Sequence, residues 1–165
     1  MSVGVAIFGA GRGARREDKE LGTGVWRRAH DRYGRGLDRF HQVLEGIDDD
    51  DLYNALVMVA NHLADLQPRV REICMRAQAL SPSNANDIPH AVHAVHRSLS
   101  KAANDLATAA QSAAIARLDG ERWGVASAGV ENVARRADVV VAGIEAAEQD
   151  LAAAETAHRG GPSPS

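Results

Sequence analysis

The chain contains little cysteine, few aromatic residues and no long apolar run, and each shortage excludes a class of protein. Its 165 residues include one cysteine, so no internal disulfide can form and folding does not depend on an oxidising compartment. No run of about 18 apolar residues occurs, which predicts that no segment spans a membrane. The short apolar run at residues 3–8 precedes a group of arginines, whereas a secretory signal has the opposite order. We therefore expect a cytoplasmic protein.

A strong net charge is also missing. The net charge of -3 and the isoelectric point near 6.1 give no general attraction for nucleic acid or an anionic membrane. Positive charge is nevertheless concentrated in the first quarter of the chain, at Arg12, Arg15, Arg16, Arg27, Arg28, Arg32, Arg35 and Arg39. Acidic residues are interspersed among these arginines, which favours a solvated face of mixed charge over a nucleic-acid surface. Binding of an acidic partner stays an open alternative.

The chain is rich in alanine, above all between residues 101 and 157. Alanine is the best helix former and is uncommon in strands, so the composition favours an all-α fold. Apolar residues also recur at alternating steps of four and three, the spacing that keeps one stripe of a helix against a partner helix. The longest such stripe consists of Leu52, Leu56, Val59, Leu63, Leu66, Val70, Ile73, Ala77 and Leu80. Similar stripes begin at Trp26, Ile88 and Trp123.

These stripes predict an elongated up-down-up-down four-helix bundle with coiled-coil-like packing over residues 24–158. The helices are expected at about 24–47, 50–80, 86–118 and 121–157. The acidic run Asp48–Asp51 suits a helix start, because the first backbone N–H groups and the helix dipole favour negative charge there. Pro68 predicts a kink inside the second helix. A turn at Asp119-Gly120 is preferred, with one continuous helix from 86 to 157 as the alternative.

The two ends of the chain show no regular period. Residues 1–23 predict a flexible arm rich in glycine and arginine, and residues 159–165 predict a disordered tail. Within the arm, Val5–Ala14 resembles the strand-then-glycine fingerprint of dinucleotide-binding Rossmann domains. No second β-rich segment follows to build the required sheet, so the arm is the favoured interpretation.

Three histidines give the sequence its one candidate metal site. His90, His93 and His96 follow each other at steps of three residues on the third predicted helix. Two neighbouring histidines of this series could bind one divalent transition metal. Each step of three residues rotates the side chain by about 60° around the helix, so all three histidines do not easily face the same metal ion. The sequence lacks the two Glu-x-x-His motifs, one on each of two helices, that ferritin-like di-iron bundles carry. We expect polar-face histidines and no cofactor, with metal binding as the alternative.

Some single residues have structural interpretations. Cys74, next to Ile73 of the longest apolar stripe, is predicted to be a small buried side chain and not a nucleophile. Trp123, beside the expected last turn, is predicted to cap the end of the core. Further apolar residues lie off the seams, at Leu37, Leu44, Val57, Ile115, Leu118, Val139 and Val141. They either complete a monomeric core or face another chain.

The sequence contains no recognisable nucleophile, carboxylate pair, phosphate loop or complete metal signature, which favours a non-enzymatic role. We expect a helical protein–protein interaction or scaffold module that binds a protein partner or a second copy of itself. The alternative is a bundle that binds a metal or a small ligand through His90, His93 and His96.

Overall fold

The computed structural model describes residues 4–124 and 127–161, and the fold over these ranges is all-helical. The prediction of an all-α protein is therefore confirmed. The helices are α1 (Gly4–Leu21), α2 (Val25–Glu45), α3 (Asp50–Asp65), α4 (Gln67–Leu80), η1 (His90–Val92), α5 (His93–Trp123) and α6 (Ser127–Arg159). No helix in the described ranges is both long and apolar enough to cross a membrane.

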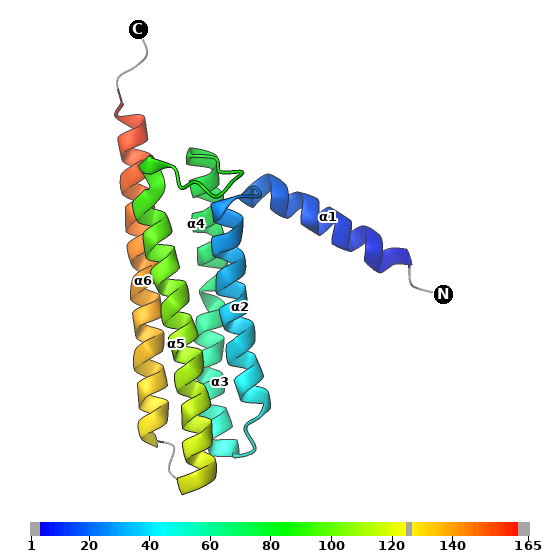
Figure 1. The fold of residues 1–165 in the computed structure, drawn as a ribbon, viewed down its shortest axis with the longest axis vertical. Coiled ribbons are helices and arrows are strands. Elements are labelled where there is room, and N and C mark those ends of the chain that lie inside the picture. The colour runs from blue at the N-terminus through cyan, green and yellow to red at the C-terminus, as the bar shows by residue number, and fades with distance from the viewer. Residues whose placement is uncertain (1–3, 125–126, 162–165) are drawn as a thin grey trace.

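The long helices lie side by side along one axis (Figure 1). α2 runs away from the end of the molecule that carries α1, and α3 and α4 return toward it. α5 then runs away again beside α2 and α6, and α6 returns toward the C-terminus (Figure 1). α5 and α2 are neighbours in this arrangement, which positions the surface discussed below.

The helix boundaries follow local chemistry. Asp49 caps α3, because its carboxylate accepts a hydrogen bond from the Leu52 N–H at 2.7 Å. The predicted kink is a division into α3 and α4 at Leu66, and Pro68 lies in the first turn of α4, where a missing N–H costs no helical hydrogen bond. The predicted segment 50–80 thus corresponds to two consecutive helices.

The last reversal of the chain comes later than the sequence predicts. α5 continues past Gly120 and ends at Trp123, where Gly124 adopts a φ of 66° and donates a hydrogen bond to the Gly120 carbonyl at 3.0 Å. Such a left-handed cap suits glycine because it has no Cβ to clash with the backbone. The structure thus has two helices here, not the continuous one. Trp123 does not cap the core as predicted, since it is 74% exposed beyond the last core layer.

α5 also begins later than expected. Residues 81–89 form a loop, followed by the short η1 and then α5 at His93. The loop is anchored by the buried Ser83, whose hydroxyl donates to the Asp87 carbonyl at 3.1 Å and lies 3.4 Å from the Val25 amide. The contact with Val25 joins residues far apart in the chain, so a sequence pattern does not show how this loop is held.

The two ends of the chain differ from the sequence prediction in part. The segment predicted as an arm without regular structure is helical from Gly4 to Leu21, and α1 projects from the end of the bundle (Figure 1). The Rossmann-like segment Val5–Ala14 lies in this helix, and the described residues contain no strand to support that resemblance. Of the predicted tail, Arg159 ends α6, while residues 162–165 lie outside the described ranges.

The core side chains contributed by α2 differ in size from those contributed by α5 and α6. α2 buries Trp26, Tyr33 and Phe40, and the Tyr33 hydroxyl donates to the Leu63 carbonyl of α3 at 2.8 Å. Burial raises the pKa of this hydroxyl, which therefore stays protonated. The α5–α6 seam instead consists largely of alanine and valine, so the two helices approach closely; a Cβ at Gly129 would lie 2.8 Å from the Cβ of Ala116.

The off-seam apolar residues separate into two groups. Leu37 and Leu44 are buried, and Val57 and Val141 are partly buried against the core, so these four residues widen the core. Ile115, Leu118 and Val139 are exposed by 59%, 54% and 40%. These three side chains lie on the outer surface, so packing in the core does not explain every apolar residue outside the stripes.

Candidate functional site

Four arginines form a stripe along the exposed side of α2. Arg28, Arg32, Arg35 and Arg39 occur at positions i, i+4, i+7 and i+11, the spacing that places side chains on one face of a helix. All four are exposed. The stripe spans eleven residues, which corresponds to about 16 Å along the helix axis. We call these four residues the arginine stripe.

The arginine stripe borders an open groove between α2 and α5. The groove has a volume of about 510 Å³ and is lined by Arg32, Arg35, Gly36, Asp38, Arg39, Gln42, Ala103 and Ala107. One wall therefore carries long cationic side chains, and the opposite wall, on α5, carries alanines. We call this hollow the α2–α5 groove.

A close approach of the two helices explains the groove. A Cβ at Gly36 would lie 2.8 Å from Cδ2 of Leu106, so any larger residue at position 36 would force the Leu106 side chain to move. Ala103 and Ala107 lie on either side of Leu106 along α5, and their methyl groups are too short to fill the space beside the arginines. Glycine at position 36 thus lets the Leu106 side chain pack directly against the backbone of α2.

The positive charge in the groove is only partly compensated. Arg32 donates to the amide oxygen of Asn104, and Arg28 donates to the Ala85 carbonyl at 2.8 Å. Neither acceptor carries a charge. Among the described residues, no ion pair involves Arg35 or Arg39. Asp38 is the one acidic residue that lines the groove, against three arginines.

The histidine series lies near one end of the arginine stripe. His96 is half-buried, and its ring meets the Trp26 indole edge-on, with centroids 6.0 Å apart. Burial lowers the pKa of His96, and the positive charges of His93, Arg28 and Arg32 lower it further. Arg28 and Arg32 thus place positive charge near the His96 ring.

The structure does not gather the three predicted histidines around one point. His90 lies in η1 and His93 begins α5, and both side chains are exposed, whereas His96 faces Trp26. Metal binding by His90, His93 and His96 stays a prediction.

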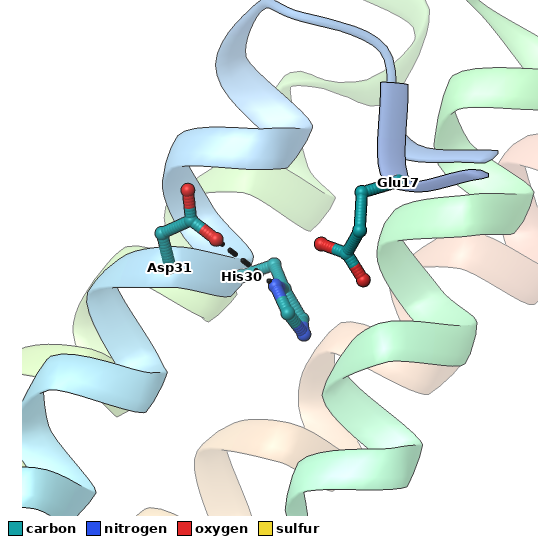
Figure 2. A group of neighbouring side chains, drawn as sticks. All are labelled: Glu17, His30 and Asp31. Atoms are coloured by element: carbon teal, nitrogen blue, oxygen red, sulfur yellow. Dashed lines mark hydrogen bonds and ion pairs between the residues drawn. The ribbon is translucent and has the colours of Figure 1, made fainter. Parts of the chain in front are cut away.

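A different cluster brings possible metal ligands together, on α1 and α2. Glu17, His30 and Asp31 each offer a ligand atom, and these atoms all lie within 4.8 Å of one another. Figure 2 shows the Glu17 carboxylate directed from α1 toward the His30 ring, with the Asp31 carboxylate on the other side of the ring. His30 Nδ1 lies 3.2 Å from Oδ1 of Asp31.

Arginines already occupy the space around this cluster. Arg71 of α4 contacts Glu17 at 2.8 Å and also pairs with Glu20. Nε of Arg27 lies 3.3 Å from Asp31 and 3.6 Å from Glu17, and this buried nitrogen has no hydrogen-bond partner within the described residues. A metal ion would have to displace guanidinium groups from the carboxylates. The cluster therefore acts as an ionic attachment of α1 to α2 and α4, which we call the α1 attachment.

Sequence analysis did not identify the α1 attachment. Glu17 and Arg71 are far apart in the chain, and no helical spacing relates them. The sequence shows only that acidic residues and arginines are both present, and this does not predict which acid pairs with which arginine.

The predicted burial of Cys74 is confirmed. The side chain is fully buried in the core, and burial raises the pKa of the thiol to about 12. The reactive thiolate is therefore rare at neutral pH, so this residue contributes packing and not nucleophilic chemistry.

Comparison with protein-family models, curated proteins and solved structures finds no match for this chain.

Proposed function

We propose that this protein is a non-enzymatic helical interaction module that binds an acidic segment of a protein partner in the α2–α5 groove. The observation that carries the proposal is the asymmetry of the groove, with the arginine stripe on one wall and small alanine side chains on the other. Guanidinium groups form directional, charge-assisted hydrogen bonds with carboxylates. An alanine wall leaves room for side chains of the partner.

The proposed partner is a protein segment with acidic and apolar positions. Amphipathic helices commonly bind by laying their apolar face into such a groove, and charged residues at the rim fix their orientation. The chain carries a net charge of -3, which opposes the general electrostatic attraction that supports nucleic-acid binding. A protein partner is therefore favoured over nucleic acid.

The finer architecture and the location form part of the same proposal. We infer coiled-coil-like packing in an up-down-up-down four-helix bundle from the continuous apolar stripes on the long helices. Such a scaffold holds the arginine stripe rigid, which lowers the entropic cost of binding. A cytoplasmic location, suggested by the single cysteine, belongs to this proposal as well.

Binding of polyglutamate to the full chain tests the proposal. We expect salt-sensitive binding by the unaltered protein and a loss of at least about tenfold in the variant Arg35→Glu/Arg39→Glu, since both charges are reversed in the groove. The matched control is Arg122→Glu/Arg136→Glu, which makes the same charge change at exposed positions on α5 and α6.

Three outcomes would overturn the proposal. They are no binding by the unaltered protein, equal losses in the groove variant and the control, and tighter binding of a single-stranded oligonucleotide than of polyglutamate at the same ionic strength. The last result would replace the protein partner with nucleic acid.

A further inference from the structure

The outer face of α6 carries a stripe that complements the α2–α5 groove. Glu131, Asp138 and Glu145 are exposed and lie seven residues apart, which places them on one face of the helix. The exposed Ala142 lies close to this line, and Val139, which is 40% exposed, lies about 100° around the helix from Asp138 and so flanks the line on one side. We call the three acids the acidic stripe.

The spacing of the two stripes matches. In the arginine stripe, Arg28 and Arg35 are seven residues apart, and so are Arg32 and Arg39. Seven residues correspond to about 10.5 Å along a helix. Two helices laid side by side with these stripes in contact would therefore pair acid with arginine at successive levels, as flanking charges do in coiled coils. Two exposed basic residues, Arg135 and Arg136, lie between Glu131 and Asp138.

The acidic stripe does not reach the groove of its own chain. α6 packs against α5, α3 and α4, whereas α2 packs against α5, α3 and α4 from the other side. Figure 1 shows α5 between α6 and α2 over most of their length. The arginine stripe and the acidic stripe thus lie at opposite corners of the helix assembly. Contact between the two stripes requires two molecules.

We propose that the occupant of the α2–α5 groove is the outer face of α6 from a second copy of this chain. This inference rests on the proposed function, because it names the partner of the same groove. In the contact, the acidic stripe faces the arginine stripe, and Val139 and Ala142 face the alanine wall formed by Ala103 and Ala107.

The position of the stripes determines the kind of assembly. Each copy has one groove and one acidic stripe on different sides, so the contact is heterologous and joins copies head to tail. Exposed ion pairs each contribute little and are screened by salt. The association is therefore weak, depends on protein concentration and declines as ionic strength rises, as suits a scaffold that assembles only where it is concentrated.

Charge exchange between the two stripes gives a decisive test by sedimentation equilibrium of the full chain. The unaltered protein is expected to show an average mass that rises with concentration at low ionic strength and falls to the monomer mass at high ionic strength. The variants Arg32→Glu/Arg39→Glu and Asp138→Arg/Glu145→Arg should each be monomeric, because like charges then face each other in the contact.

An equimolar mixture of the two variants should associate again. The acidic α6 of the first variant then meets the basic groove of the second, and the acidic groove of the first meets the basic α6 of the second. Far-ultraviolet circular dichroism of each variant checks that the helices persist, since all four altered positions are exposed.

Failure of this inference is distinguishable from failure of the proposed function. An unaltered protein that stays monomeric at every concentration at low salt overturns self-association, and the proposed function stands if the same protein binds polyglutamate in the groove. If the unaltered protein neither associates with itself nor binds polyglutamate, the inference and the proposed function are both overturned. Association that survives each charge reversal, or that does not return in the mixture, assigns the contact to another surface and overturns the inference.

Discussion

The arginines of α2 differ in their surroundings: one group consists of Arg27 alone, and the other consists of Arg35 and Arg39. Arg27 faces α1 and lies within 3.6 Å of Glu17, 2.8 Å of Asp18 and 3.3 Å of Asp31. Arg35 and Arg39 face the groove and take part in no ion pair among the described residues. The first group stabilises the position of α1, whereas the second leaves charge available for another molecule. An arginine acquires its role from the carboxylates that the fold brings to it.

The largest expected effect comes from Trp26, which precedes both groups of arginines on α2. Its side chain is fully buried, its indole N–H donates to the Ser81 carbonyl at 3.4 Å, and its ring contacts His96. Trp26→Ala should lower the free energy of unfolding by about 3–5 kcal/mol, because it leaves a cavity in the core. Urea denaturation measures the change. Trp123→Ala, at the exposed tryptophan, is the control and should have little effect; equal losses in the two variants would contradict the assigned packing.

A smaller effect is expected at the α1 attachment. Arg71→Met keeps much of the apolar stem but removes the charge that meets Glu17 and Glu20. We expect a loss of about 1 kcal/mol, because the pairs are only partly shielded from water. The loss should be local, with faster amide exchange in α1 and unchanged exchange in α5 and α6. Arg135→Met is the control on an exposed helix face, and undiminished protection of α1 in the Arg71 variant would argue against the attachment.

The histidine near the groove should make stability depend on pH. The pKa of His96 is lowered below its usual 6.5, so the unfolded chain binds a proton more readily than the folded chain. The free energy of unfolding should therefore fall as the pH decreases below about 6.5. His96→Gln should reduce this slope in urea denaturation between pH 5 and 7, whereas the control His41→Gln, at an exposed position, should not. An identical slope in the His96 variant would refute the assignment.

The groove itself should matter least for stability. Arg35→Ala/Arg39→Ala should change the free energy of unfolding by less than about 0.5 kcal/mol, because neither side chain has a charged partner in the described structure. The same variant should lose binding of polyglutamate. A large loss of stability would show that these arginines serve the fold, as Arg27 and Arg71 do, and would remove the difference between the two regions.

Sequence analysis identified residues of the candidate site but not the groove that they line. It identified the arginines and the histidines as chemical types, and it interpreted the arginine-rich first quarter as a solvated face of mixed charge. It did not identify the groove, because that hollow depends on Gly36 meeting Leu106 of a helix distant in the chain. It also placed the metal prediction on His90, His93 and His96, while the compact group of possible ligands formed at Glu17, His30 and Asp31.

The sequence by itself determined the all-α fold, the kink beside Pro68 and most of the core, because helix propensity, capping and apolar spacing act over a few residues. Tertiary structure decided which arginines are neutralised, where the groove lies and which off-seam apolar residues stay exposed. It also decided that Trp123 is exposed and that the loop containing Ser83 extends over residues 86–89, where a helix was expected. Ion pairing and close packing join residues far apart in the chain, so no local pattern records them.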